Sequence, residues 1–253
     1  MSTTYLISGT TRGIGRGLVS ALLLRPNTLV FAGVRDPSAK AAQDLLSLPK
    51  APDSSVFLIK LDSSSESDAA QAIQTLQQEH NITHLDVVIA NAGILTTAAP
   101  CREVTLDSLR SHFEINTLGP IILFQACLSL LQKSSNPKFV LTTSAVASCT
   151  IAPSLPAPVV AYAVSKVAAN WFVSRAQGEH PEICFLPIHP GLVVTDMSSS
   201  FMEHAAEPGS GDDFLRAISV EECVKGYLQV VDKATKEKDG GKFVQWDGEG
   251  LPW

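Results

Sequence analysis

The sequence predicts a single α/β domain, and three observations lead to that prediction. Short β-branched or apolar runs alternate with longer amphipathic segments, which is the pattern of βαβ units on a parallel sheet. A glycine-rich turn, "SGTTRGIG", follows the first apolar run and precedes the first amphipathic segment. The 253 residues suffice for one large core, and no repeat or low-complexity linker divides them.

Seven short runs have the composition of buried strands, and longer segments between them have the composition of helices. In chain order the predicted strands are 3–8, 28–34, 55–61, 85–91, 138–144, 183–190 and 241–247. The predicted helices include 15–24, 67–80, 105–116 and 162–178. The apolar run 118–131 is shorter than the ~20 residues of a membrane span, so we interpret it as a buried or interface helix and expect no membrane partner.

Composition excludes several classes of function. The formal net charge is −6 and no basic arm is present, which disfavours nucleic-acid binding. Five scattered cysteines without CxxC spacing indicate reduced, mostly buried thiols in a cytoplasmic protein. The six histidines form no metal-binding pattern, so no metal site is predicted. We expect His112 on a helix surface and His189 as a hydrogen-bonded structural residue.

The glycine-rich turn at 8–15 has the context of a phosphate-binding loop, because it joins a strand to a helix. Gly9 allows a sharp turn off the strand, Gly13 lets the backbone approach a pyrophosphate, and Gly15 lets the helix pack tightly on the sheet. The diphosphate would rest on the helix N-terminus. Taken alone, such a loop could also be a structural turn of any α/β protein, so the rest of the chain has to decide.

Six motifs follow one another in a fixed order along the chain. They are the Gly-x-x-x-Gly-x-Gly loop, "NAG" (91–93), Asn116 in "FEINTLGP", Ser144 in "LTTSAVAS", "YAVSK" (162–166) and "PGLVVTD" (190–196). Over essentially the whole chain this set resembles the short-chain dehydrogenase/reductase superfamily. The resemblance implies a single nucleotide-binding Rossmann domain over 1–253, with a doubly wound, seven-stranded parallel sheet flanked by helices. It also implies a nicotinamide cofactor and a homodimer or homotetramer.

Tyr162 and Lys166 have the spacing that a proton relay needs. Reduction of a ketone requires a hydride for carbon and a proton for oxygen; the nicotinamide supplies the first and Tyr162 the second. Lys166 follows four positions later on the same helix face, where its ammonium would lower the phenol pKa from its usual ~10. By resemblance, Lys166 also binds the nicotinamide ribose, Ser144 positions the substrate carbonyl, and Asn116 holds a water of the relay. The alternative is an ordinary amphipathic helix with a packed tyrosine and a solvated lysine.

Ser144 lies further from Tyr162 than is usual in the family, because the segment "CTIAPSLPAPVV" (149–160) is lengthened. Ser148 is therefore a reserve candidate for the serine role, although Ser144 falls at the end of a predicted strand, where the family places it. The proline-rich segment either lines the substrate pocket or forms a surface loop, and both interpretations stay open.

The end of the second predicted strand, "FAGVRD", favours NADP(H). Val34 stands where an acidic residue would bind the ribose of NAD, and Arg35 follows with paired donors for a 2′-phosphate. Arg12 adds a second positive charge. In the alternative, Asp36 pairs with Arg35 or itself binds the ribose of NAD. The other cofactor contacts that the resemblance implies are Gly9, Thr10, Gly13, Ile14, Gly15, Asp62, Asn91, Ala92, Gly93, Tyr162, Lys166, Val193 and Thr195.

Two further segments bear on the substrate. The loop at about 196–214 carries aromatic and apolar side chains among polar ones and is predicted to be a lid over a flat apolar substrate, unless those side chains pack on the body. The ending "GGKFVQWDGEGLPW" resembles fungal ketoreductases similar to norsolorinic acid ketoreductase, whose substrates are polyketides or other secondary metabolites.

We therefore predict an NADPH-dependent reductase of a small carbonyl substrate, aromatic, polyketide-like or another secondary metabolite. One alternative is other chemistry on the same scaffold: alcohol oxidation, imine reduction, or reduction coupled to rearrangement. The second is a non-catalytic protein that senses the NADP redox state. The intact set of Tyr162, Lys166 and Ser144 argues against that second alternative.

Overall fold

One parallel sheet runs through the computed structural model, which describes residues 2–154, 158–198 and 216–253. Its strands are β1 (Thr3–Ser8), β2 (Thr28–Val34), β3 (Ser55–Lys60), β4 (Val87–Ala90), β5 (Lys138–Thr142), β6 (Cys184–His189) and β9 (Val244–Gln245). They lie in the order β3-β2-β1-β4-β5-β6-β9. Because the chain runs outward from β1 in one direction and then from β4 in the other, the sheet is doubly wound, which confirms the predicted Rossmann-type fold.

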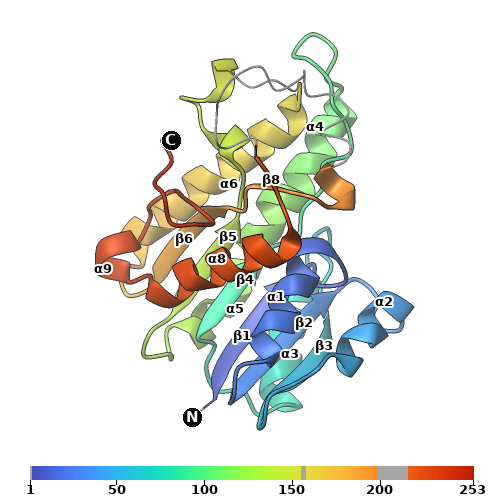
Figure 1. The fold of residues 1–253 in the computed structure, drawn as a ribbon, viewed down its shortest axis with the longest axis vertical. Helices are drawn as coiled ribbons and strands as arrows, with labels where there is room; N and C mark the ends of the chain where they lie inside the picture. The colour runs from blue at the N-terminus through green and yellow to red at the C-terminus, as the bar shows by residue number, and fades with distance from the viewer. Residues whose placement is uncertain (1, 155–157, 199–215) are drawn as a thin grey trace.

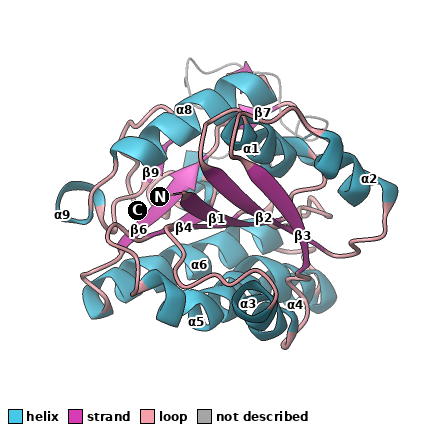
Figure 2. Cartoon of the chain, turned by 90° about the horizontal axis from the view of Figure 1, so that it is seen from below, coloured by secondary structure: helices cyan, strands magenta, loops and turns pink. Residues whose placement is uncertain are grey.

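Two layers of helices cover the sheet (Figure 2). One layer holds α1 (Gly13–Leu23) and α8 (Val220–Lys233), and the other holds α3 (Asp68–Gln78), α4 (Leu106–Phe113), α5 (Gly119–Leu131) and α6 (Val160–Glu179). The short helices α2 (Lys40–Gln43) and α9 (Lys236–Asp239) lie at opposite sides of the molecule (Figure 1). A separate pair of parallel strands, β7 (Leu192–Val193) and β8 (Ala217–Ile218), follows β6.

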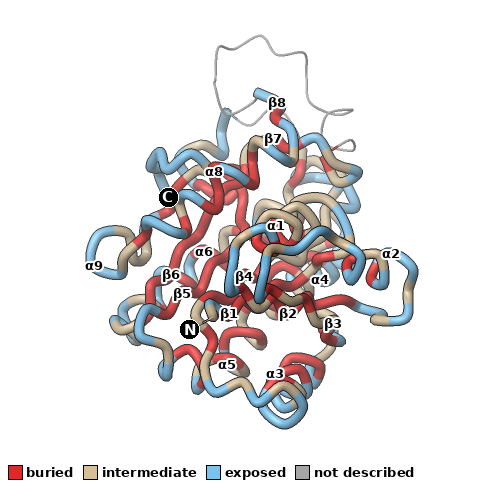
Figure 3. Tube along the Cα trace, turned by 60° about the horizontal axis from the view of Figure 1, so that its bottom comes forward, coloured by how far each residue is buried: buried red, intermediate tan, exposed pale blue. Residues whose placement is uncertain are grey.

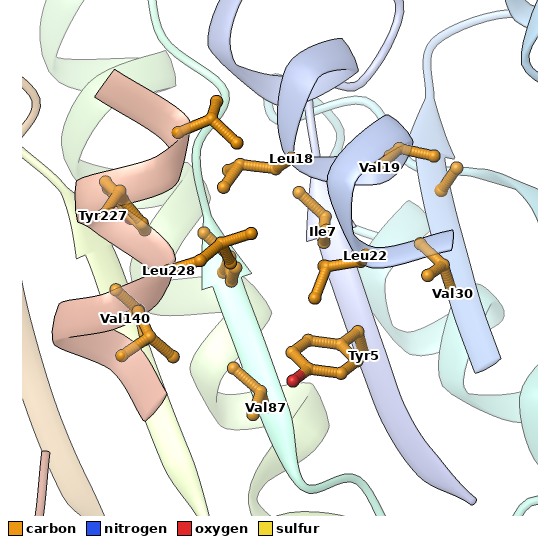
Figure 4. Packing of buried hydrophobic residues seen from close by; sticks show 14 of the residues in the cluster. Tyr5, Ile7, Leu18, Val19, Leu22, Val30, Val87, Val140, Tyr227 and Leu228 are labelled. Carbon is orange, nitrogen blue, oxygen red and sulfur yellow. The ribbon is translucent and has the colours of Figure 1, made fainter. Parts of the chain in front are cut away.

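The hydrophobic core lies on both faces of the sheet, because successive residues of a strand point to opposite sides. On β1, Tyr5 and Ile7 pack under α1 and α8, whereas Leu6 packs on the face covered by α3, α5 and α6. Figure 4 shows the first of these clusters, with Leu18 and Leu22 of α1 beside β1. The strands are buried along most of their length, and α2 and α9 are largely exposed (Figure 3).

The predicted helix 105–116 does not end where expected. From α4 the chain passes through a π-helical turn, η2 (Glu114–Leu118), directly into α5. The combined helix Leu106–Leu131 is long and apolar enough, by length and composition only, to cross a membrane. Half of its apolar window is buried inside the fold, where Leu123, Phe124 and Leu130 belong to the sheet core. It therefore packs as a core helix of an α/β fold.

The last strand is shorter than predicted: the prediction was 241–247, and the strand is Val244–Gln245. Two ranges lie outside the described residues. Residues 199–215 include most of the predicted lid (196–214), and residues 155–157 belong to the lengthened segment.

Candidate active site

Each glycine of the loop has a structural reason to be glycine. Gly9 (φ 69°) and Gly13 (φ 54°) adopt the left-handed conformation that glycine tolerates best, and Gly9 and Gly15 have no room for a side chain. A Cβ on Gly9 would lie 2.8 Å from the Ala92 Cα atom. A Cβ on Gly15 would collide with the Gly9 carbonyl oxygen and lie 2.7 Å from Asn91 Nδ2. The loop, the start of α1 and the "NAG" segment are therefore packed as one unit.

Hydrogen bonds between strand ends hold this unit in place. Asn91 Nδ2 donates to the carbonyl oxygens of Ser8 and Gly9, each at 3.1 Å. The Ser8 hydroxyl accepts the backbone N–H groups of Asn91 (3.1 Å) and Ala92 (3.0 Å). At the helix start, Arg12 makes no side-chain cap. That side chain therefore leaves the first N–H groups of α1 uncapped, an arrangement that suits a phosphate.

A cleft of about 520 Å³ opens above the C-terminal ends of β1, β2 and β4, the position at which doubly wound sheets bind ligands. Most of the predicted cofactor residues line it: Gly9, Thr10, Arg12, Gly13, Ile14, Gly15, Arg35, Asp62, Asn91, Ala92, Gly93, Tyr162, Lys166 and Thr195. Val193 instead lines a smaller adjoining cavity. The fold thus gathers these residues from segments that are far apart in the sequence.

Two arginines line the cleft: Arg12 in the glycine loop and Arg35 directly after β2. Arg12 Nη1 lies 3.1 Å from Asp196 Oδ2, and both side chains are mostly exposed. Arg35 forms no ion pair with any residue that the structure describes. Asp36 accepts hydrogen bonds from the Ser38 hydroxyl (2.6 Å) and N–H (2.8 Å), which lower the pKa of Asp36. The alternative Arg35–Asp36 pair is therefore not formed, and the Arg35 guanidinium is available to an anion.

Tyr162 and Lys166 lie one turn apart on α6, with Lys166 Nζ 5.7 Å from the centre of the Tyr162 ring. The Lys166 ammonium donates to the Thr142 carbonyl oxygen at 2.8 Å. Burial lowers the pKa of Lys166 to about 8. Burial also raises the pKa of Tyr162 to about 12, against a hydrogen bond with Ser144 that lowers it. The expected lowering of the Tyr162 pKa by Lys166 is thus wrong here, because desolvation of the phenol dominates.

Asn116 occupies the π-helical turn η2, a local structure frequent at functional sites. Its Oδ1 atom accepts the Ile94 N–H at 2.8 Å, and its Nδ2 group donates to the Ile94 carbonyl and the Ser165 hydroxyl, each at 3.0 Å. Asn116 lines neither cavity. It borders Gly93, where a Cβ would lie 3.1 Å from Asn116 Oδ1 and 3.5 Å from Lys166 Nζ. Asn116 therefore fixes the segment after "NAG" against α6.

Ser144 follows β5 and caps a short 3-10 helix, η3 (Ala145–Ala147). Together with Tyr162 it lines a second cavity, of about 120 Å³, whose walls include the apolar side chains of Leu95, Val146 and Leu192. The reserve candidate Ser148 is fully buried, lines neither cavity, and accepts the Ile151 N–H. The geometry therefore favours Ser144 over Ser148.

The lengthened segment 149–160 lines neither cavity with its described residues, and Ala152–Ser154 is exposed. The Thr150 hydroxyl donates to the backbone oxygen of Trp253 at 2.7 Å, and the Trp253 ring packs on Phe243 with centroids 5.6 Å apart. This part of the segment is a surface loop tied to the tail.

Three residues near the site were missed or misjudged from the sequence. Trp246 packs against Gly191 and Gly226, where a Cβ would meet its ring. His112 is not on the surface: it is buried, with Nδ1 2.7 Å from the Ser108 carbonyl and Nε2 3.3 Å from the Thr96 N–H. His189 is buried but not hydrogen-bonded by any described residue, and burial lowers its pKa to about 4. The sequence signal that places His189 near the site is its position directly before "PG" (190–191).

The class of protein follows from the fold and the site together. The sheet is doubly wound, its cleft holds a glycine loop, and a serine, a tyrosine and a lysine lie beside that cleft. This combination defines a dinucleotide-dependent oxidoreductase. The family model for short chain dehydrogenase matches residues 3–206, and the chain belongs to that family. It is 39% identical to norsolorinic acid ketoreductase of Aspergillus parasiticus over 99% of this chain and 91% of the relative. It is 36% identical to norsolorinic acid ketoreductase of Emericella nidulans over 99% of this chain and 94% of the relative.

Solved structures agree with this assignment. The NADPH-bound carbonyl reductase from chicken fatty liver superposes with a TM-score of 0.84, at 27% identity, and the match covers all of both chains. The fold and the enzyme class predicted from the sequence are thereby confirmed.

Proposed function

We propose that this protein is an NADPH-dependent ketoreductase in which Tyr162 gives a proton to the carbonyl oxygen of the substrate. One observation carries the proposal: Tyr162 lines both the 520 Å³ cleft and the 120 Å³ cavity. Its phenol therefore stands at the junction of a space that fits a dinucleotide and a space that fits a small ketone. The similarity to norsolorinic acid ketoreductases and to an NADPH-bound carbonyl reductase supports this assignment.

The residues of the cleft fit NADP(H), which when bound supplies the hydride. The backbone of the glycine loop and the uncapped start of α1 would hold the pyrophosphate. Arg35, assisted by Arg12, would hold the 2′-phosphate. Asp62 would approach the adenine, and the "NAG" segment would pass beneath its ribose. Thr195 and Val193 would contact the carboxamide end.

The pKa values of Tyr162 and Lys166 suit proton delivery. With a pKa of about 12, Tyr162 is protonated at neutral pH and carries the proton that the carbonyl oxygen needs. With a pKa of about 8, the Lys166 ammonium is the stronger acid, so a proton passes downhill from Lys166 to a Tyr162 phenolate, directly or through an intervening hydroxyl. The Ser144 hydroxyl forms a hydrogen bond with Tyr162 and would orient the substrate carbonyl. Asn116 positions the backbone beside Lys166.

The smaller cavity indicates the kind of ketone. Its walls are mainly apolar, and about 120 Å³ is close to the space that one aromatic ring occupies. An aryl or polyketide-like ketone is therefore the substrate class that we propose. The lid over 196–214, a homodimeric or homotetrameric assembly and a cytoplasmic location stay predictions.

The test is a comparison of the wild type with Tyr162→Phe. Fluorescence titration measures the binding of NADPH and NADH, and NADPH oxidation is then followed with a panel of aryl ketones and quinones. We expect tighter binding of NADPH, and turnover that disappears in Tyr162→Phe while NADPH binding stays. If neither nucleotide binds, or if Tyr162→Phe keeps full turnover, the proposal is wrong.

A further inference from the structure

The last residue of β5, Thr142, makes hydrogen bonds to helices on both faces of the sheet. Its hydroxyl oxygen lies 2.9 Å from the hydroxyl oxygen of Tyr227 on α8. Its carbonyl oxygen accepts a hydrogen bond from the Lys166 ammonium of α6 at 2.8 Å. All three residues are buried. One strand residue thus links a tyrosine on one face of the sheet to the lysine of the candidate site on the other.

The sheet itself holds this end of β5 on one side. Within the described residues, β5 pairs with β4 as far as Leu141, opposite Ala90. Pairing with β6 continues to Thr142, and the Thr143 N–H donates to the Ile188 carbonyl oxygen at 2.9 Å. The side toward β4 borders the 520 Å³ cleft, which Thr142 and Thr143 both line. A bond from α8 therefore adds a second restraint where the strand ends at the cleft.

Tyr227 is well placed to supply that restraint. It is fully buried in the core cluster between the sheet and the helices α1 and α8, part of which Figure 4 shows. Thr142 comes two residues after Val140, a member of the same cluster, so both side chains point to the α8 face. Packing fixes the Tyr227 ring, and a ring held in this way gives its hydroxyl partner a fixed position.

The contact with the Thr142 carbonyl bears on the charge of Lys166. A hydrogen bond to the ammonium favours the charged form, whereas burial disfavours it and lowers the Lys166 pKa to about 8. If the carbonyl moved away, the burial penalty would remain without that compensation. The Lys166 pKa therefore reports whether the end of β5 is held in place.

Other titratable groups leave this report undisturbed. Besides Tyr162 on α6 itself, the buried or half-buried titratable side chains on the elements packed against α6 are His112 (α4), Glu114 (η2), Cys127 (α5), Cys184 and His189 (β6). Burial alone shifts the pKa of Lys166, so none of these groups acts on it measurably.

We propose that Tyr227 is a positioning residue of the candidate active site: its hydroxyl restrains the end of β5 so that the Thr142 carbonyl stays bound to the Lys166 ammonium. Helix α8 thereby supports the proton relay from the opposite face of the sheet. The importance of this support rests on the proposed function, in which Lys166 restores the Tyr162 proton.

The pKa of Lys166 in the full-length protein without cofactor tests the proposal apart from turnover. Lysine side chains are labelled with ¹³C, and the Lys166 Cε resonance, assigned by its loss in Lys166→Met, is followed by NMR as the pH is raised. We expect Tyr227→Phe, which keeps the ring, to lower the Lys166 pKa by about one unit, tenfold in its acid dissociation constant. Thr142→Val should do the same, and Thr142→Ser, which keeps a hydroxyl, should retain the wild-type pKa.

The matched control is Tyr5→Phe. Tyr5 is a second buried tyrosine of the same core cluster, but it lies on β1 and its hydroxyl bonds with Arg25. This change removes a buried phenol hydroxyl as well, and it should leave the Lys166 pKa unchanged. Thermal melts show that each variant is folded at the temperature of the titration.

The outcomes separate the two proposals. A wild-type Lys166 pKa in both Tyr227→Phe and Thr142→Val, or an equal fall in Tyr5→Phe, would overturn the positioning role and leave the reductase function standing. If the pKa depends on Tyr227 but the wild type oxidises NADPH with no ketone, the positioning role stands and the proposed function fails. If both hold, kcat should fall with rising pH about one unit earlier in Tyr227→Phe than in the wild type.

Discussion

The Lys166 ammonium lies 5.7 Å from the centre of the Tyr162 ring, and burial reverses the order of acidity of the two groups. Their ordinary pKa values are 10.5 and 10.0, so in water the phenol is slightly the stronger acid. In the fold the pKa of Lys166 falls to about 8 and that of Tyr162 rises to about 12. In the proposed reaction, Lys166 would therefore be the group that restores the Tyr162 proton.

We expect Lys166→Met to be more stable than the wild type at pH 7, by about 1–3 kcal/mol. The folded pKa of Lys166 lies below its unfolded value, so the burial penalty is fully present below about pH 8 and is relieved as the pH rises toward 10.5. The gain should therefore shrink over that window in urea unfolding at several pH values. Loss of the hydrogen bond to Thr142 offsets part of it.

An exposed lysine on α8 provides the control for this experiment. Lys225→Met should change the unfolding free energy by less than about 0.5 kcal/mol. A Lys166→Met protein that is less stable at pH 7, or whose stability difference is flat with pH, would show that the buried ammonium is not penalised.

Features that depend on local spacing could be predicted from the sequence. Gly9 directly follows a predicted strand and Gly15 begins a predicted helix, so their role in close packing could be predicted from this short segment alone. Tyr162 and Lys166 share a helix face because they are four positions apart. The alternation of strands and helices likewise predicted a parallel sheet, although several helices and strands begin or end a few residues away from the predicted positions.

Features that depend on packing between distant segments could not be predicted. Helix spacing placed Lys166 near Tyr162 but carried no information on the desolvation that raises the phenol pKa. His112 is buried because the backbone at Thr96 folds over α4. His189, at the end of β6, is buried without a hydrogen-bond partner among the described residues. No pattern within a single segment reports such an environment.

We expect two glycine-to-alanine changes to have opposite effects. Gly15→Ala places a Cβ against the Gly9 carbonyl oxygen, so it should destabilise the fold by more than about 2 kcal/mol and abolish NADPH binding. Gly178→Ala, near the end of α6, meets no atom within 4 Å and should stabilise by about 0.5–1 kcal/mol. Thermal unfolding and NADPH titration of both variants provide the check. A Gly15→Ala protein with wild-type nucleotide affinity would contradict the close packing of the loop.

Replacement of Arg35 should change which cofactor the protein prefers. Its guanidinium lines the cleft without an acidic partner among the described residues, so Arg35→Ser should weaken NADPH binding about 10- to 100-fold. NADH affinity should hardly change, because NADH has no 2′-phosphate. Fluorescence titration of both nucleotides gives the ratio, and Arg110→Ser, whose arginine pairs with Asp107 on α4, serves as the control. Equal losses for NADPH and NADH would mean that Arg35 supports the loop rather than the phosphate.

The buried hydroxyls of Tyr227 and Thr142 lie 2.9 Å apart, and the carbonyl of the same Thr142 accepts from Lys166. Tyr227→Phe leaves the Thr142 hydroxyl buried without that partner, and Thr142→Val does the same to the Tyr227 phenol. We expect each change to cost about 1–2 kcal/mol, and the double variant to cost little more than either one, because no orphaned hydroxyl remains. Urea unfolding of the four proteins measures the coupling. Strictly additive losses would show that the two hydroxyls do not depend on each other.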